Sequence, residues 1–229
     1  MAKRSFFITG TDTDAGKTIV TAGLLAAANK VGKRTIGLKP VAAGCEDTPE
    51  GLRNSDAVLL QETASVKLSY DQVNPIAFES AIAPHIAAMR EGRMMSGERI
   101  AAYCRGAMMQ PADLVLVEGA GGWRVPLSYR ETMAQIPKSL QVPVILVVGM
   151  KLGCINHALM SAESISRDGI PLAGWIANRV DADMECYEEN RDTIANMLRA
   201  PMLAEIPHVT EPTPDNIAEF IDIDRLFAG

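Results

Sequence analysis

The stretch GTDTDAGKT, residues 10–18, has the form of an altered phosphate-binding loop. The usual pattern is G-x-x-x-x-G-K-[ST], but here five residues separate the two glycines, and Thr11 stands where the first glycine belongs. An apolar run precedes the stretch and an alanine-rich helical segment follows it, so backbone N–H groups at the helix start would face an anion. Lys17 would add a positive charge and Thr18 a hydroxyl for Mg²⁺. The stretch therefore predicts a nucleotide phosphate site, with a ligand-free glycine turn as the alternative.

Short apolar runs recur on both sides of this stretch and indicate buried β-strands. They are SFFIT (5–9), TIGLK (35–39), LVLVE (114–118), PVILVVG (143–149) and LAGWIAN (172–178). Helix-like segments alternate with them, and two such segments, 16–32 and 154–169, end at a glycine. This alternation predicts an α/β fold with a doubly wound, mainly parallel sheet. We expect a single domain over residues 1–229, with a long polar loop at 44–56.

Residues able to do chemistry stand at the ends of four of these runs. Gly10, Lys39, Glu118 and Asn178 each follow or close a predicted strand. Because ligands of such sheets bind beyond the carboxyl ends of the strands, we expect these residues to lie near one another. Glu118 stands where a Walker-B acid would, and a second lysine would stabilise the charge of a transferred phosphoryl group. For Lys39 alone, a side chain extending to solvent is the alternative.

A carboxylate near phosphate needs a cation between the two groups, so Asp56 and Glu118 are candidate Mg²⁺ ligands beside Thr18. Asp56 has a helix N-cap as its alternative role. EGAGG (118–122) lacks the last glycine of a dinucleotide fingerprint. NRVD (178–181) is similar to the guanine-reading N-K-x-D of GTPases, with arginine in place of lysine.

The composition narrows the class of protein further. At 229 residues the chain can bury roughly 70% of its unfolded surface, so it needs no disulfides. Its four cysteines are scattered, which favours a reducing, cytoplasmic location. A formal net charge of -6 argues against a nucleic-acid partner. The longest apolar run, 142–150, is about half the ~20 residues of a membrane span, and no signal peptide is expected.

Taken together, the motifs resemble those of the dethiobiotin synthetase family over essentially the whole chain. The elements that carry the resemblance are GTDTDAGKT (10–18), LKPVAAG (38–44), TPEGLRNSDA (48–57), LVLVEGAGGW (114–123), PVILVVGMKLGCINHA (143–158) and LAGWIAN (172–178). The resemblance implies a P-loop NTPase-like fold and a homodimer. It also implies ATP and Mg²⁺ as cofactors, and 7,8-diaminononanoate with CO₂ or bicarbonate as substrates. ATP would phosphorylate a carbamate, and ring closure would then give the cyclic urea of dethiobiotin in biotin biosynthesis.

The resemblance also implies roles for individual residues. Lys39, Lys17 and Thr13 would be catalytic, and Thr18, Asp56 and Glu118 would bind Mg²⁺. Nucleotide-binding residues would be Asp14, Ala15, Gly16, Lys17, Thr18, Ile19, Asp56, Glu118, Asn178, Arg179, Pro207, His208 and Val209. Substrate-binding residues would be Thr13, Lys39, Ala43, Gly119, Gly121, Gly122, Lys151, Leu152 and Asn156. Lys151 and Asn156 would reach the substrate carboxylate across the dimer interface.

Two positions depart from the family pattern. Ala43 stands where serine is common, and its missing hydroxyl removes one neutral hydrogen bond, worth about 0.5 to 1.5 kcal/mol. Asp14 replaces glutamate and shortens the side chain by one methylene. Residues after Glu211 match the family poorly, and we assign no chemistry to them.

Three other classes of protein remain open at this point. A partner-switching ATPase of the MinD or ParA type shares the fold, but it carries an early lysine in the loop and often a basic amphipathic tail. Here the early position is Thr11 or Asp12 and the tail is acidic. A GTPase is the second class, and an amidating synthetase acting on a large carboxylic acid is the third.

Overall fold

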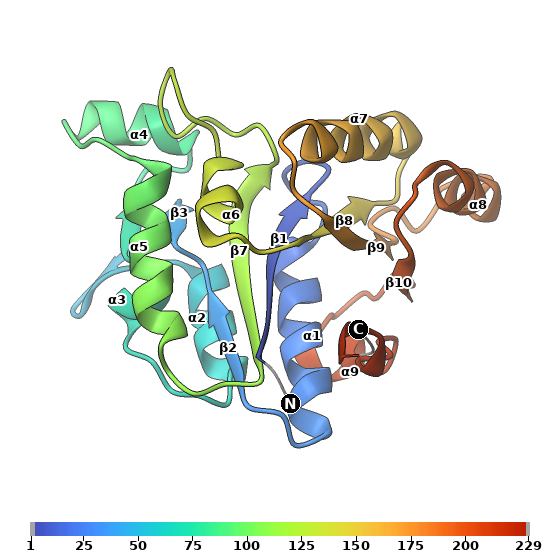
Figure 1. Ribbon diagram of the computed structural model, residues 1–229, viewed down its shortest axis with the longest axis horizontal. Coiled ribbons are helices and arrows are strands. Elements are labelled where there is room, and N and C mark those ends of the chain that lie inside the picture. The colour runs from blue at the N-terminus through green and yellow to red at the C-terminus, as the bar shows by residue number, and fades with distance from the viewer. Residues whose placement is uncertain (1–2, 228–229) are drawn as a thin grey trace.

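A six-stranded parallel sheet forms the centre of the protein (Figure 1). The structure, a computed structural model, describes residues 3–227. In spatial order the strands are β10 (Met202–Ile206), β9 (Leu172–Asn178), β8 (Val144–Gly149), β1 (Arg4–Gly10), β7 (Leu114–Gly122) and β2 (Thr35–Leu38). Every neighbouring pair is parallel. The predicted α/β fold with a doubly wound parallel sheet is confirmed, and the sixth strand, β10, is an addition to the five predicted runs.

Helices cover both faces of the sheet. They are α1 (Lys17–Lys30), α2 (Ser55–Thr63), α3 (Tyr70–Val73), α4 (Pro84–Arg90), α5 (Gly97–Met108), α6 (Gln135–Leu140), α7 (Cys154–Arg167), α8 (Tyr187–Met197), α9 (Pro214–Ala218) and α10 (Asp224–Phe227). Four short strands form two small sheets, in which β3 (Val41–Ala43) pairs with β6 (Ile76–Phe78) and β4 (Glu46–Thr48) pairs with β5 (Gly51–Arg53).

The apolar runs form central strands because both of their faces are buried. In β1, Phe6 and Ile8 pack into one hydrophobic cluster together with Leu24 of α1. Phe7 points to the opposite face and joins a second cluster that includes Ile100 of α5. A strand with helices on both sides needs apolar residues at every position, which explains the continuous rather than alternating pattern.

The order of the strands places the phosphate loop at a topological switch point. From β1 the chain passes through α1 to β2 at one edge of the sheet, whereas after β7 it passes through α6 to β8 on the other side of β1. In doubly wound sheets a crevice opens at the carboxyl ends of the strands where this reversal occurs. Residues 11–16 follow β1 at that point.

Two expectations about local structure are wrong. Residues 44–56 are not a single polar loop, because the β4–β5 hairpin lies within them and Asn54 then caps α2 by accepting a hydrogen bond from the Ala57 N–H at 3.3 Å. Asp56 consequently lies in the first turn of a helix. Glu118 lies inside β7 rather than at its end, because the glycine-rich residues after it extend the strand as far as a pairing of Gly122 with Gly10.

The segment after Glu211 has a packing role. Helix α9 lies against α1, and a Cβ atom added at Gly23 of α1 would be only 2.4 Å from Cγ2 of Ile217. Both helices belong to the same hydrophobic cluster on one face of the sheet. The glycine in α1 therefore allows the close approach of the C-terminal segment.

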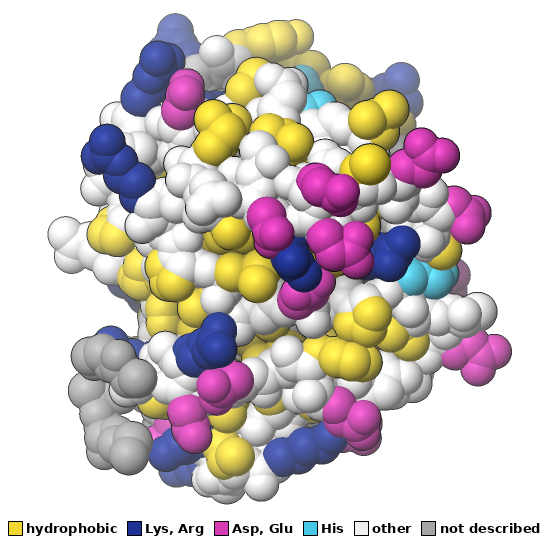
Figure 2. Space-filling model, turned by 90° about the vertical axis from the view of Figure 1, so that its right-hand side faces the viewer, with side chains coloured by type: hydrophobic (Ala, Val, Ile, Leu, Met, Phe, Trp, Pro, Cys, Tyr) yellow, Lys and Arg dark blue, Asp and Glu magenta, His cyan; other side chains and the backbone are white. Residues whose placement is uncertain are grey.

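Charged side chains of both signs are interspersed on the face drawn in Figure 2. Over the whole sequence, acidic residues outnumber basic ones by 28 to 22. Among residues 3–227, no helix is both long and apolar enough to cross a membrane.

Candidate active site

The phosphate loop is held in place by its neighbours on the β8 and β9 side. The Thr11 N–H donates to the carbonyl of Val147 at 3.0 Å, and the Thr11 hydroxyl accepts from the Gly149 N–H at 3.3 Å. The Asn178 side-chain amide donates to the carbonyl of Ala15 at 3.0 Å. The hydroxyl of the threonine at the altered position thus adds a hydrogen bond to β8 that glycine could not make.

Gly16 is required both by its backbone conformation and by space. Its φ is 81°, in the left-handed region that glycine adopts without strain. An added Cβ would lie 2.1 Å from Nδ2 of Asn178. Asp14 also has a positive φ of 58°. The loop therefore has a backbone shape that few side chains tolerate, next to the start of α1, where N–H groups are free to meet an anion.

Lys17 begins α1 and folds back over the loop. Its ammonium group donates to the carbonyl of Asp12 at 3.0 Å, and its side chain is mostly buried. Burial, reinforced by the charge of Lys39, holds the pKa of Lys17 below its ordinary value. The residue therefore places a desolvated cation beside the proposed phosphate position.

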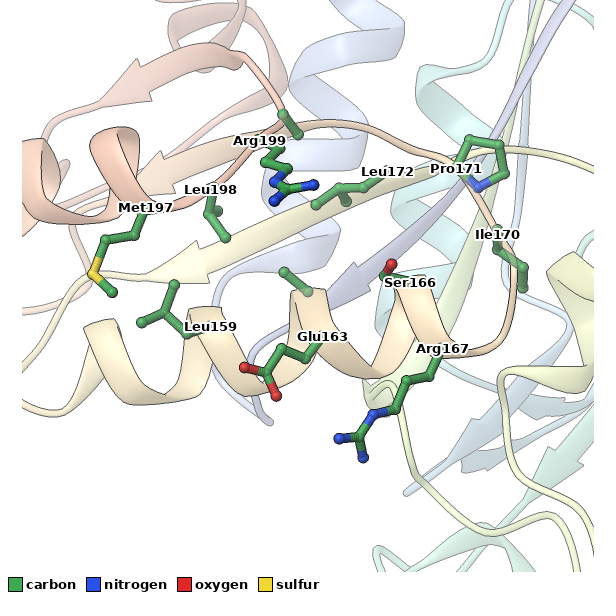
Figure 3. Close-up of a pocket in the computed structure, with 12 residues that line it drawn as sticks. Leu159, Glu163, Ser166, Arg167, Ile170, Pro171, Leu172, Met197, Leu198 and Arg199 are labelled. Carbon is green, nitrogen blue, oxygen red and sulfur yellow. The ribbon is translucent and has the colours of Figure 1, made fainter.

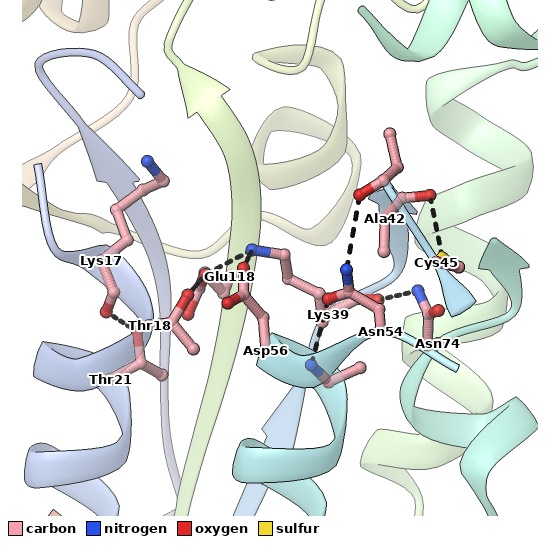
Figure 4. A network of polar contacts seen from close by, with 12 residues as sticks. Lys17, Thr18, Thr21, Lys39, Ala42, Cys45, Asn54, Asp56, Asn74 and Glu118 are labelled. Atoms are coloured by element: carbon pink, nitrogen blue, oxygen red, sulfur yellow. Dashed lines mark hydrogen bonds and ion pairs between the residues drawn. The ribbon is translucent and has the colours of Figure 1, made fainter. Parts of the chain in front are cut away.

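Lys39, Asp56, Glu118 and Thr18 form a polar cluster beside the loop (Figure 4). The Lys39 ammonium donates to Oδ2 of Asp56 at 2.8 Å and to Oε1 of Glu118 at 2.6 Å. The Thr18 hydroxyl donates to the same Glu118 oxygen at 2.7 Å. Because Lys39 is only 5% exposed, a side chain extending to solvent is ruled out for it.

The charges of this cluster depend on one another. Burial alone would lower the pKa of Lys39, but the carboxylates of Glu118 and Asp56 outweigh it and raise that pKa. Burial would likewise raise the pKa of Asp56, but the nearby Lys39 charge holds it below its ordinary value. Lys39 and Asp56 are therefore both charged near neutral pH.

The oxygen atoms of the cluster suit Mg²⁺. This cation prefers hard oxygen ligands and usually combines one or two carboxylates with phosphate oxygens and water. Oε2 of Glu118 is fully buried and makes no hydrogen bond, so this carboxylate has an unused acceptor. Thr18, Asp56 and Glu118 could hold Mg²⁺ together with oxygens supplied by a nucleotide. The additional oxygens are needed because the described residues hold no cluster of three or more His, Cys, Asp or Glu side chains suited to a metal.

A cavity of about 750 Å³ opens next to the loop. From the predicted site residues it brings together Thr13, Asp14, Gly16, Lys17, Thr18, Ile19, Lys39, Ala43, Asp56 and Gly121. Its remaining lining is mainly apolar and was missed by sequence reasoning: Ala42, Asn54, Ala81, Ile82, Ala83, Pro84, Ala120, Val125 and Pro126. The only signal for the segment at 81–84 is a proline at the start of a helix, which gives no hint of a binding wall.

Two predicted nucleotide residues outside the cavity lining are Ala15 in the loop and Glu118 in β7, and the others lie at the β9 and β10 ends of the sheet. Asn178 ends β9 and is buried behind the loop. The Arg179 N–H donates to the carbonyl of Ile206 at 2.9 Å, and its guanidinium lies 4.7 Å from the ring centre of Tyr187. Pro207, His208 and Val209 directly follow β10. Asn178 therefore contacts the loop, and all five residues at the β9 and β10 ends lie outside the cavity lining.

Three predicted substrate residues come after β8, outside the cavity lining. The Lys151 ammonium lies 3.4 Å from Oδ1 of Asp12 in the same chain, Leu152 is 91% exposed, and Asn156 lies in the first turn of α7. Gly119 and Gly122 belong to β7. A Cβ added at Gly119 would lie 2.9 Å from Cζ of Phe7, so this glycine allows close packing.

A second cavity, of about 740 Å³, lies between α7 and the chain that follows α8 (Figure 3). Leu159, Leu172 and Leu198 form an apolar floor, and Glu163, Arg167 and Arg199 stand around it. None of the predicted site residues lines this cavity. The candidate site is therefore the cavity at the phosphate loop.

Comparison with known proteins identifies the family. A family model described as an AAA domain matches residues 4–216. A protein of Cellvibrio japonicus named ATP-dependent dethiobiotin synthetase BioD is 55% identical over 226 residues, covering 99% of each chain. The chain belongs to the ATP-dependent dethiobiotin synthetase family. A relative of the same name from Marinobacter nauticus is 50% identical, again over 99% of each chain.

Solved structures of greater evolutionary distance support the fold. The MinC:MinD cell division complex of Aquifex aeolicus matches with a TM-score of 0.61 at 18% identity, covering 98% of this chain and 94% of that chain. MinD of Pyrococcus horikoshii, solved with Mg-ADP, matches with a TM-score of 0.56 at 17% identity, covering 98% and 89%. These likenesses show a P-loop NTPase fold, as the sequence predicted. Family membership and fold together identify an ATP-using ligase of biotin biosynthesis.

Proposed function

We propose that this enzyme closes the ureido ring of dethiobiotin from 7,8-diaminononanoate and CO₂, with Mg-ATP as the phosphoryl donor. The observation that carries the proposal is that one cavity combines two kinds of wall. The phosphate loop, Lys17 and Lys39 supply positive charge on one side, and the residues at 81–84 supply an apolar surface on the other. A substrate with a hydrocarbon chain and a reacting carbamate fits this combination.

The chemistry needs an activated carbonyl carbon. One amine of the substrate adds to CO₂ and loses a proton, giving a carbamate. An oxygen of the carbamate then attacks the terminal phosphorus of ATP, and ADP leaves. The second amine attacks the carbonyl carbon of the resulting mixed anhydride, expels phosphate, loses a proton and closes the ring.

Lys17 and Lys39 provide the electrostatic stabilisation in this scheme. Negative charge spreads over the peripheral oxygens during phosphoryl transfer, and preplaced cations stabilise it without any covalent step. Both ammonium groups are largely removed from water, which strengthens their effect on a nearby anion. Thr13 lines the same cavity and would orient the carbamate.

Thr18, Asp56 and Glu118 would hold Mg²⁺, which would neutralise phosphate charge while bound. Gly16 and its neighbours would bind the phosphates, while Asn178, Arg179 and residues 207–209 would border the base. The Asn178 amide nitrogen donates to the loop, and the side-chain carbonyl oxygen, which is the acceptor of this amide, would accept from the amine of adenine. Selectivity for adenine over guanine is part of the proposal, and nucleotide competition tests it.

The far end of the substrate is assigned to a second copy of the chain. Lys151 and Asn156 lie beyond the cavity lining, and the highly exposed Leu152 stands between them in sequence. We propose that this segment reaches the substrate carboxylate of a partner subunit in a homodimer. Analytical ultracentrifugation tests the oligomeric state. Scattered free cysteines support a cytoplasmic enzyme, and we propose a single domain over 1–229 without a nucleic-acid or membrane partner.

The decisive experiment measures phosphate release from Mg-ATP by the purified protein. Diaminononanoate and bicarbonate are added separately and then together, and the products are analysed by mass spectrometry. We expect release to require both substrates and dethiobiotin to form. A rate of phosphate release that does not change when either substrate is added would reject the proposal and favour a partner-switching ATPase. Pelleting with liposomes or DNA would then test that alternative.

A further inference from the structure

The ammonium group of Lys39 lies between two carboxylates of the proposed Mg²⁺ site. Its distances of 2.8 Å to Asp56 and 2.6 Å to Glu118 are those of direct, charge-assisted hydrogen bonds. The side chain of Lys39 is 6% exposed and that of Glu118 is fully buried, so water does not screen this pair. A cation of the protein itself therefore already offsets part of the negative charge of the two carboxylates.

The two oxygen atoms of the Glu118 carboxylate have different surroundings. Oε1 accepts hydrogen bonds from both Lys39 and Thr18, whereas Oε2 is buried without any partner. Mg²⁺ requires oxygen ligands at about 2.0–2.1 Å in near-octahedral positions. An ammonium group that touches both carboxylates repels a dication arriving between them, so the two cations compete for the same oxygens.

We propose that Lys39 is the resident counter-ion of the metal site and that Mg²⁺ entry displaces its ammonium group into the cavity. This inference rests on the metal site proposed above. Lys39 also lines the cavity at the phosphate loop, so its displaced ammonium has space next to the reacting oxygens. Metal binding and the delivery of the lysine to the phosphoryl group would then be one coupled event. The nucleotide-free protein would bind the metal weakly.

Lys17 provides a matched control. It carries the same charge at the same end of the cavity, but its ammonium donates to the Asp12 carbonyl instead of a carboxylate. Removing the charge of either lysine would strengthen metal binding to some extent, because it reduces the repulsion of a nearby cation. Only removal of Lys39 would free the metal ligands themselves.

The test measures binding of Mn²⁺, used as a paramagnetic probe for Mg²⁺, to nucleotide-free protein by electron paramagnetic resonance. Wild type, Lys39→Met and Lys17→Met are compared. We expect Lys39→Met to bind Mn²⁺ about tenfold more tightly than wild type, and Lys17→Met to gain at most about threefold. We also expect Mn²⁺ to raise the melting temperature of Lys39→Met more than that of wild type. If Lys39→Met does not fold, Lys39→Gln, which keeps a hydrogen-bond donor, replaces it.

Equal gains in the two variants, or no gain in either, would overturn the inference. A second arm repeats the titration on wild type with a non-hydrolysable ATP analogue. One outcome is that wild type binds Mn²⁺ with the analogue, but nucleotide-free Lys39→Met binds Mn²⁺ no more tightly than wild type. This outcome would reject the counter-ion role of Lys39 and leave the proposed metal site intact. Failure of wild type to bind Mn²⁺ even with the analogue would reject the metal site and the inference together.

Discussion

The phosphate loop lies between two groups of charged side chains that are built differently. On the β7 and β2 side, Lys39 and Glu118 are buried, Asp56 is partly exposed, and Lys39 contacts both carboxylates at less than 3 Å. On the β8 side, Asp12 of the loop lies 3.4 Å from the Lys151 ammonium and 3.5 Å from Nδ1 of His157, and all three side chains are partly exposed.

The difference separates two tasks. A closely bonded cluster around a buried lysine holds its charges in fixed positions, as stabilisation of a phosphoryl transition state requires. A half-exposed group with long contacts costs little to rearrange, as binding the end of a flexible substrate requires. The proposed reaction therefore has its rigid part on one side of the loop and its adaptable part on the other.

The largest expected difference between the two sides is in stability. Glu118→Ala would leave the buried Lys39 with only Asp56 as a partner and should reduce the free energy of unfolding by about 3–5 kcal/mol. Asp12→Ala removes only partly exposed contacts and should cost less than about 1 kcal/mol. Urea unfolding of both variants measures this difference. Similar losses would show that the two groups do not differ in the way we describe.

The second prediction concerns catalysis. Lys39→Met should lower kcat about 100- to 1000-fold, because it removes a charge that acts on the transition state. Lys151→Met should instead raise KM for diaminononanoate by about tenfold with little change in kcat, because it removes a charged contact to the substrate. Steady-state kinetics with saturating Mg-ATP separates the two effects. A loss of kcat as large in Lys151→Met as in Lys39→Met would place both lysines in the same role.

The third prediction is a stability loss in acid that arises at Asp56, on the Lys39 side of the loop. The pKa of Asp56 in the folded protein is below its ordinary value of 3.8, so its contribution is complete above that value and is lost as the pH falls through the lowered one. At alkaline pH, the relevant group is Lys39. Its contribution to the stability of the folded protein is complete below pH 10.5, and it is lost as the pH rises through the raised pKa of Lys39.

Urea midpoints measured from neutral pH down to about pH 2 test the acid limb. Asp56→Asn should flatten the fall in stability there, and Asp12→Asn serves as the matched control, because Asp12 is also partly exposed but has only long contacts. A fall that is unchanged in Asp56→Asn would show that other carboxylates cause it.

The smallest expected effect is at Ala43, which lines the cavity beside the buried cluster. Ala43→Ser adds one neutral hydrogen bond to substrate or phosphate, worth about 0.5 to 1.5 kcal/mol. KM for diaminononanoate should therefore fall by roughly two- to tenfold with little change in stability. An unchanged KM would show that the serine hydroxyl of the family pattern has no part in binding here.

Some features of the site could be predicted from sequence because they are local. The loop at residues 10–18 lies between a strand and a helix in one continuous stretch, and Lys17 and Thr18 follow it directly. The apolar run before Glu118 predicted that this residue belongs to a strand of the sheet, but not that the strand continues past it. The cavity wall at 81–84 could not be predicted, because short apolar segments away from the sheet have no distinctive periodicity.

The sequence by itself determined the parallel α/β sheet, the phosphate loop and the identities of the charged residues, because hydrophobic periodicity and contiguous motifs are encoded locally. Only the tertiary structure decided how those charges are paired. Lys39 is 17 residues from Asp56 and 79 residues from Glu118 along the chain. The pairing of β2 with β7 and the packing of α2 against β2 bring the three side chains into contact. The physical reason is that burial and distance, which are properties of the folded chain, decide whether a lysine extends to solvent or becomes the counter-ion of two carboxylates.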